Sequence, residues 1–115
     1  MAFSINAAGR LLRNGKPVEL IPARPSHTGG PFAATPRIIV MHFTFGGTGR
    51  SSAEWFRNPQ NTLKSSAQVV VDRDGSVIQC VPFTTISHHA GKSKWGPLTG
   101  LNSHSFGIEL ANWGY

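Results

Sequence analysis

Two ionisable residues lie within otherwise apolar stretches of this sequence, where each could take part in chemistry. His42 lies near the end of IIVMHF, and a neutral imidazole nitrogen can bind a metal ion or accept a proton. Glu109 lies in FGIELAN, where burying a carboxylate is costly unless the group is paired or hydrogen-bonded. A lone histidine in a strand is more often a hydrogen-bonded core residue, and a glutamate in an edge strand can face solvent. Neither residue assigns a function by itself.

A pair of histidines follows in the loop SHHAGKSKWG. Because neighbouring side chains of an extended chain point to opposite sides, His88 and His89 cannot easily bind one metal ion together. Zinc sites built from sequence neighbours use wider spacings than this pair offers. Beside Lys92 and Lys94, these histidines are better suited to hydrogen bonding with an acidic, sugar-like or peptide-like ligand.

The stretch that carries His42 is the first strong element of the sequence. Residues 38–43 are apolar on both alternating faces, which predicts a central strand covered on both sides. His42 would lie at or near the carboxyl end of that strand, the edge of an open sheet where ligands bind.

A short helix is predicted after the glycine-rich loop that follows this strand. Ser51 and Glu54 have the spacing of a capping box at a helix start, and Pro59 stops the segment. Trp55 and Phe56 would anchor the helix to the sheet.

The clearest local pattern is a hairpin. An apolar run ends at Val71, a turn follows over residues 72–75, and a second run extends over residues 77–81. The last stretch predicts one more strand, in which Gly107 and Glu109 share one face and their apolar neighbours share the other.

Residues 1–36 predict an extended N-terminal arm, because prolines and repeated Gly, Ser and Thr interrupt every apolar run. One short strand is expected there, over residues 18–21. The remaining residues, 37–115, are expected to form the compact part of the chain.

Composition limits the classes of function. The chain has 115 residues, enough for one domain, and a net charge of +6 that favours an anionic partner. The basic residues are scattered without a charge run, which argues against a dedicated nucleic-acid helix. The single cysteine, Cys80, cannot form an internal disulfide, and its apolar surroundings predict a buried, inert thiol. No apolar run suits a signal peptide or a membrane span.

Four stretches in order carry a resemblance to a known family: IIVMHFTFGGT, SSAQVVVDRDGSVIQCVPF, SHHAGKSKWG and LNSHSFGIELAN. Over about residues 37–112 the chain resembles the zinc-dependent N-acetylmuramoyl-L-alanine amidases that share the peptidoglycan recognition protein fold. The resemblance implies an α/β fold with a mixed central β-sheet flanked by helices, and a groove that holds peptidoglycan or a muropeptide. Residues 37–115 would then be the N-terminal portion of a single amidase domain.

The resemblance also implies roles for individual residues. His42 would be a ligand of Zn²⁺, and Glu109 would assist a zinc-activated water that cleaves the amide between N-acetylmuramic acid and L-alanine. His89, Gly91 and Asn102 would contact the substrate or shape the groove.

The chain departs from the family pattern at several points. Gln68 stands where the family usually has a histidine, and His88 stands where it usually has a tryptophan. In the family a histidine and then an aspartate or cysteine complete the zinc site downstream of the GIEL strand, so His42 is one of three expected ligands. The fold is therefore expected to be C-terminally incomplete, with exposed apolar surface that would favour oligomers.

Two other classes of function remain open from the sequence. A non-catalytic peptidoglycan- or muropeptide-binding module would retain the HAG loop and the positive charge. A basic nucleic-acid binder would rest on charge alone, and no recognition helix, zinc finger or aromatic stacking motif supports it. Without a visible export signal, a cytoplasmic or phage-encoded role is favoured over a secreted one.

Overall fold

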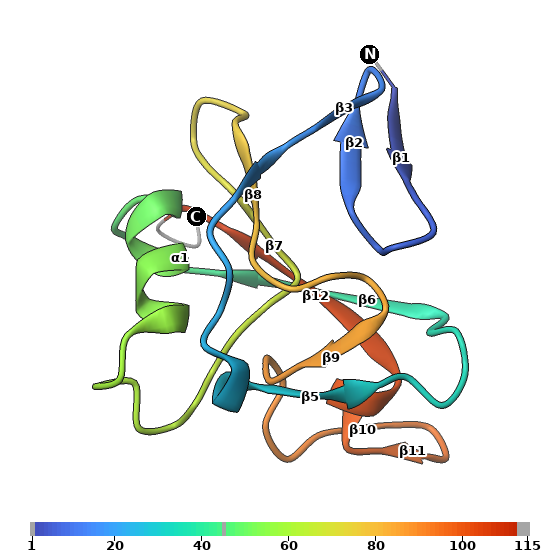
Figure 1. The fold of residues 1–115 in the computed structure, drawn as a ribbon. Coiled ribbons are helices and arrows are strands. Elements are labelled where there is room, and N and C mark those ends of the chain that lie inside the picture. Colours follow the sequence, from blue (N-terminus) through green and yellow to red (C-terminus); the bar gives the residue numbers. More distant parts are fainter. Residues whose placement is uncertain (1, 45, 113–115) are drawn as a thin grey trace.

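A five-stranded mixed sheet organises the chain, in the order β4-β8-β7-β12-β6 (Figure 1). This computed structural model describes residues 2–44 and 46–112. The strands of the sheet are β4 (Glu19–Leu20), β6 (Ile38–Phe43), β7 (Val69–Val71), β8 (Val77–Gln79) and β12 (Ser105–Leu110). Strand β12 runs parallel to both β6 and β7, whereas β7 and β8 are antiparallel. The predicted α/β fold with a mixed central sheet is confirmed.

The first 36 residues contain more strand than the sequence predicts. Strands β1 (Phe3–Ile5), β2 (Leu11–Arg13) and β3 (Lys16–Pro17) form a separate antiparallel sheet. Strand β4 falls within the predicted residues 18–21 and joins the central sheet beside β8. Pro17, the last residue of β3, pairs with Leu12 of β2, so a proline does not prevent strand pairing here.

Two further strand pairs and two short 3₁₀ helices complete the fold. The helices are η1 (Pro25–His27) and η2 (Leu101–Ser103). Strand β5 (Thr28–Pro31) pairs with β9 (Thr85–Ser87), and β10 (Lys94–Trp95) pairs with β11 (Leu98–Thr99). Of the helices in the described ranges, none has the length and apolar character needed to cross a lipid bilayer.

The predicted hairpin is confirmed. Val71 pairs with Val77 across an antiparallel ladder, and the Asp72 N–H donates to the Ser76 carbonyl at 2.9 Å. Gly75 adopts a φ of 84°, a left-handed conformation that the turn requires and that glycine adopts without steric cost.

Helix α1 (Gly49–Arg57) begins earlier than predicted. Its N-cap is Thr48, whose hydroxyl accepts a hydrogen bond from the Ser51 N–H while the Ser51 hydroxyl accepts one from the Thr48 N–H. The predicted box between Ser51 and Glu54 is therefore wrong. Asp72 draws the start of the helix toward the β7–β8 turn by accepting from the Gly49 N–H at 2.9 Å.

The main apolar core lies between α1 and the central sheet. It comprises Ile21, Ala23, Ala53, Phe56, Ala67, Val70, Ile78, Cys80 and Val81. Phe56 is buried as predicted, whereas Trp55 is 45% exposed and does not anchor the helix in the core, because it lies on the next face of the helix. Cys80 is buried as predicted, and desolvation raises the pKa of its thiol to about 12.

A second apolar cluster covers the opposite face of β7 and β8. Leu11, Val18 and Val69 pack with Val71, Val77 and Phe83 beneath the β1–β2–β3 sheet. Alternation along the strands separates this cluster from the main core, since Val69 and Val70 point to opposite faces.

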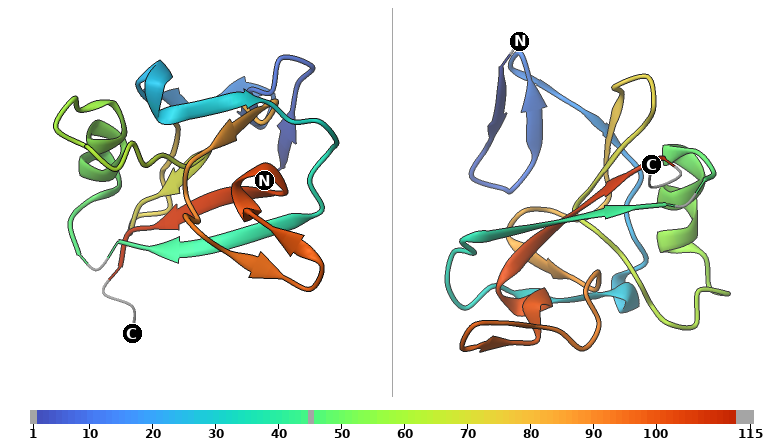
Figure 2. Two further views of the ribbon diagram at one scale, coloured as in Figure 1. Left: turned by 90° about the horizontal axis from the view of Figure 1, so that it is seen from below. Right: turned by 180° about the vertical axis from the view of Figure 1, so that it is seen from behind.

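Strand β6 lies at the edge of the central sheet in the described part of the chain, next to β12 (Figure 2). Ile39, Met41 and Phe43 are 58%, 54% and 43% exposed. The prediction of a central strand covered on both sides is therefore wrong. An apolar run indicates which side chains of a strand could be buried. It does not indicate whether another element covers the strand.

Candidate functional site

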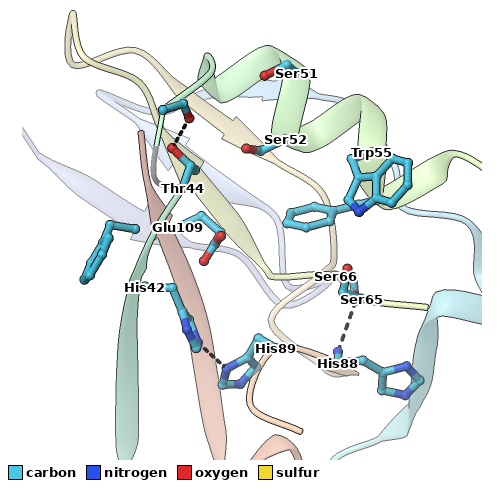
Figure 3. Close-up of a pocket in the computed structure, with 13 residues that line it drawn as sticks. His42, Thr44, Ser51, Ser52, Trp55, Ser65, Ser66, His88, His89 and Glu109 are labelled. Carbon is cyan, nitrogen blue, oxygen red and sulfur yellow. Dashed lines mark hydrogen bonds between the residues drawn. The ribbon is translucent and has the colours of Figure 1, made fainter. Parts of the chain in front are cut away.

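A cleft of about 410 Å³ opens beside the carboxyl ends of β6 and β12, facing α1 (Figure 3). It is lined by His42, Phe43, Thr44, Gly46, Ser51, Ser52, Trp55, Phe56, Ser65, Ser66, His88, His89 and Glu109. The lining is mostly polar and joins parts of the chain that are far apart in sequence. Its place at the strand ends is where a sheet of this kind binds ligands.

His42 and Glu109 lie next to each other on the floor of the cleft. They are direct partners in the parallel register of β6 and β12, so their side chains project from the same face of the sheet. Both side chains are half-buried. Desolvation lowers the pKa of His42 and raises the pKa of Glu109, so burial favours the uncharged form of each.

The ring of His89 approaches His42 from the loop after β9. His42 Nε2 lies 3.0 Å from His89 Nδ1, and the planes of the two rings meet at 74°. The other nitrogen of His89, Nε2, lies 3.1 Å from the Ser105 hydroxyl. Desolvation, followed by repulsion from His42, lowers the pKa of His89 to about 4, despite an opposing contribution from Ser105.

Gly107 makes room for the His89 ring. A Cβ atom at position 107 would lie 2.4 Å from His89 Cγ, far closer than two carbon atoms can approach. The backbone of the loop that carries this ring is also fixed, because Asn102 Oδ1 accepts from the N–H groups of His89 and Ala90 at 3.0 and 2.8 Å. The strand glycine and the loop asparagine thus set the position of His89 together.

His88 and His89 point apart, as predicted from their adjacency (Figure 3). The His88 ring lies 3.1 Å from the Lys64 carbonyl, on the far wall of the cleft from His42. The buried Ser66 holds the backbone of His88 in place, since its hydroxyl accepts from the His88 N–H and donates to the His27 carbonyl.

Gln68, the amide that departs from the family pattern, lies beneath the cleft rather than in its lining. It is 0% exposed, and its Nε2 donates to the Thr85 carbonyl at 2.8 Å. Its Oε1 accepts from the Ser87 hydroxyl at 2.7 Å and from the Gly107 N–H at 2.8 Å. The amide therefore links β9 to β12 directly under the site.

The structure brings together three of the five residues singled out from the sequence. His42, Glu109 and His89 line the cleft, whereas Gly91 and Asn102 do not. Gly91 is exposed in the loop, and Asn102 shapes that loop from behind. Substrate contact by these two residues stays a prediction.

Sequence reasoning missed Ser105 and the exposed part of Trp55. Ser105 directly precedes the FGIEL strand, and a buried serine there gives no periodic signal. Trp55 is one helix position before the buried Phe56, and a helical period alone would have placed the two on different faces.

The described residues supply only part of a metal site. Within residues 2–44 and 46–112 no group of three or more His, Cys, Asp or Glu side chains could hold a metal ion. His42 by itself suits the role of a ligand, because its only hydrogen bond uses Nε2 and leaves Nδ1 without a partner among the described residues. The described chain thus offers one ligand and a neighbouring carboxylate.

Comparison with known proteins identifies the family of the chain. The family model for N-acetylmuramoyl-L-alanine amidase matches residues 32–115. The 1,6-anhydro-N-acetylmuramyl-L-alanine amidase AmpD of Escherichia coli (strain K12) is 33% identical over 101 residues, covering 75% of this chain and 55% of the relative. The AmpD of Enterobacter cloacae is 32% identical over 117 residues, covering 87% of this chain and 62% of the relative.

Solved structures show the same likeness. The crystal structure of a selenomethionine AmpD derivative superimposes with a TM-score of 0.67 at 26% identity, over 83% of this chain and 61% of that chain. A mutant endolysin from Bacillus subtilis gives a TM-score of 0.62 at 21% identity, over 82% and 60%, a likeness of fold alone. The chain thus spans between 55% and 62% of the length of these relatives and neighbours.

Proposed function

Because this chain belongs to the family of N-acetylmuramoyl-L-alanine amidases, we propose that it hydrolyses the amide between N-acetylmuramic acid and L-alanine of a peptidoglycan stem peptide. The names of the relatives make a 1,6-anhydro-N-acetylmuramyl peptide the first substrate to test. Residues 37–115 would belong to one amidase domain, to which β4 and β5 contribute from the N-terminal arm of residues 1–36.

The observation that carries this proposal is the pairing of His42 with Glu109 at the floor of the cleft. Two parallel strands place an imidazole and a carboxyl group side by side at the open edge of the sheet. Amide hydrolysis needs a group that takes a proton from water and returns it to the departing amine, and a half-buried carboxyl group can do both.

Glu109 is the proposed catalytic acid and base. Burial raises the pKa of its carboxyl group, which brings the group closer to the pH at which proton transfer in both directions is efficient. In its ionised form Glu109 would accept a proton from the attacking water. In its protonated form it would deliver that proton to the nitrogen of L-alanine.

His42 is the proposed zinc ligand in this chain. Burial lowers the pKa of its ring, which favours the uncharged form that a metal ion requires. When bound, zinc supplies a Lewis acid for the amide carbonyl and lowers the pKa of water.

The remaining walls of the cleft would bind the rest of the substrate. Trp55 is 45% exposed and offers an apolar ring face for a sugar or an alanine methyl group. Ser51 and Ser52 on α1, and His88 across the cleft, offer hydrogen-bonding groups to a muropeptide. Gly91 and Asn102 would shape the wall that carries His89.

The test is to incubate the purified chain and its His42→Ala variant with the anhydro-muramyl peptide and zinc, and to detect free stem peptide by mass spectrometry. We expect release by the wild-type chain and a loss of release in the variant. The absence of stem-peptide release by the wild-type chain, or equal release by both chains, would contradict the proposal.

A further inference from the structure

A line of hydrogen bonds runs from His42 into the protein. His42 Nε2 contacts His89 Nδ1 at 3.0 Å, His89 Nε2 contacts the Ser105 hydroxyl at 3.1 Å, and that hydroxyl contacts the Leu101 carbonyl at 2.6 Å. The Leu101 carbonyl oxygen, the last group in this line, can only accept a hydrogen bond. The direction of every bond in the line can therefore be assigned from this end.

The assignment follows from counting protons. The Ser105 hydroxyl has one proton, and it donates that proton to the Leu101 carbonyl. Ser105 must then accept from His89, so His89 Nε2 carries a proton. Neither of the two ring partners of His89 carries a negative charge, so this half-buried ring is most stable when uncharged. Its Nδ1 is then an unprotonated acceptor.

Only one donor remains for the bond between the two histidines. Because His89 Nδ1 accepts, His42 Nε2 must carry the proton that lies between the rings. An uncharged His42 has one ring proton, so its Nδ1 is left with a free lone pair. Nδ1 has no partner among the described residues, and the ring that carries it lines the cleft.

We propose that His89 is a positioning residue which, held by Ser105, fixes the tautomer and orientation of His42 so that Nδ1 is the atom that binds the metal ion. This inference rests on the proposed function. It gives His89 a role other than substrate contact, and it assigns a function to Ser105, which no motif in the sequence singles out. Metal-binding histidines usually donate their second ring N–H to a carboxylate, a backbone carbonyl or water, and here the unprotonated nitrogen of His89 takes the place of that acceptor.

The surroundings of His89 suit a fixed partner rather than a mobile one. Asn102 holds its backbone, Gly107 gives its ring room against β12, and Ser105 is 0% exposed. A substrate-binding histidine would need a free ring nitrogen, whereas both nitrogens of His89 are engaged inside the protein.

Nitrogen NMR of the histidine rings tests the assignment without any metal. The chain, labelled with ¹⁵N and stripped of metal with a chelator, is examined near neutral pH by long-range proton–nitrogen correlation. We expect the Nε2 of His42 to show the shift of a protonated nitrogen and Nδ1 that of an unprotonated nitrogen. The reverse pattern at His42 would overturn the proposal.

Variants then test whether His89 and Ser105 cause that preference. Ser105→Ala removes one oxygen atom and frees His89 to change tautomer, so we expect His42 to shift toward a mixture of its two tautomers. Ser105→Thr keeps the hydroxyl and should preserve the wild-type pattern. His88→Leu, at the neighbouring ring that points away, is the matched control and should also preserve it. An unchanged His42 tautomer in both Ser105→Ala and His89→Leu would overturn the positioning role.

Zinc affinity, measured by competition with a chromophoric chelator, separates this proposal from the proposed function. Loss of a partner that orients a metal ligand weakens binding by about 10- to 100-fold, which we expect for His89→Leu but not for His88→Leu. His89→Leu that binds zinc as tightly as wild type would overturn the inference and leave the amidase proposal intact. A wild-type chain that takes up no zinc would contradict both the zinc role of His42 and the inferred purpose of the His42 tautomer.

Discussion

Strands β6 and β12 present opposite kinds of surface on their two faces. On the cleft face, His42 and Glu109 alternate with positions that point away, and His89 lies over Gly107. On the other face, Ile39 and Met41 expose apolar side chains to solvent. The same six-residue pairing thus carries a polar site on one side and an apolar surface on the other.

The comparison shows that a few polar residues are enough to turn one face of an apolar strand into a functional site. Because side chains alternate along a strand, one polar residue at every second position converts one face without disturbing the ladder. The polar face is then held by directed hydrogen bonds, and no buried side-chain nitrogen or oxygen of the described residues lacks a partner. We therefore expect substitutions on the cleft face to change chemistry and those on the apolar face to leave it unchanged.

The largest expected effect compares neighbours on the two faces of β12. Glu109→Gln keeps the size of the side chain but removes the proposed acid and base, and should lower kcat by about 10²- to 10⁴-fold. Ile108→Val, which changes the opposite face, should keep kcat close to the wild-type value. Both are measured as release of stem peptide under saturating substrate. Equal loss in the two variants would mean that the faces are not functionally separate.

A second effect concerns the buried amide under the cleft. Gln68→Leu leaves the Thr85 carbonyl, the Ser87 hydroxyl and the Gly107 N–H without their partner. Each unsatisfied group costs about 1–3 kcal/mol, so we expect the free energy of unfolding to fall by about 3 kcal/mol or more. Urea denaturation measures this, and Gln60→Leu at an exposed position is the control. A fall no larger than that of the control would show that the amide does not hold β9 to β12.

These residues also show which parts of the molecule can be predicted from sequence. The β7–β8 hairpin, the end of α1 and the placement of Glu109 and Gly107 on one face all follow from local patterns. The predicted start of α1 is wrong because the capping pair is Thr48 with Ser51 rather than Ser51 with Glu54, and Asp72, distant in sequence, also accepts from the Gly49 N–H. The prediction that β6 is covered on both faces is wrong, because that coverage depends on elements outside the strand.

The candidate site likewise has a part that the sequence predicts and a part that it does not predict. His42 and Glu109 could be named from their unusual polarity within apolar stretches. Their direct pairing needed the strand order of the sheet, which no local pattern contains. The contact from His42 to His89, and from there to Ser105, needed the path of a loop around Gly107. Short polar residues such as Ser105 have no periodic signature, so only the three-dimensional arrangement reveals them.

A third, smaller effect is a pH dependence of stability that arises on the cleft face. Burial raises the pKa of Glu109 above its ordinary value of 4.5, so the folded chain holds a proton over a pH range where the unfolded chain has lost it. The free energy of unfolding should therefore fall as pH rises through that range, and the penalty is complete above the folded-state pKa. Glu109→Gln removes this ionisation, so it should be more stable than wild type at about pH 8 but not at about pH 4.

Denaturation of both chains at the two pH values provides the measurement. The difference between wild type and variant isolates Glu109 from the other groups that titrate in this range. A variant that is less stable than wild type at the higher pH would mean that the ionised carboxylate has a stabilising partner in the folded chain.

The smallest expected effect on stability lies on the apolar face of β6. Ile39→Thr with Met41→Thr replaces two exposed apolar side chains by a residue that strands accommodate well, so the free energy of unfolding should change by only about 0.5 kcal/mol per site. Adjacent exposed apolar groups favour self-association, because contact between copies removes them from water. The double variant should therefore sediment as a smaller species than wild type at high concentration. Leu63→Thr is the control, because Leu63 is 90% exposed but lies in a loop away from this strand. If Leu63→Thr lowers association as much as the β6 variant, association reflects apolar exposure in general, and the contrast between the two faces has no bearing on assembly.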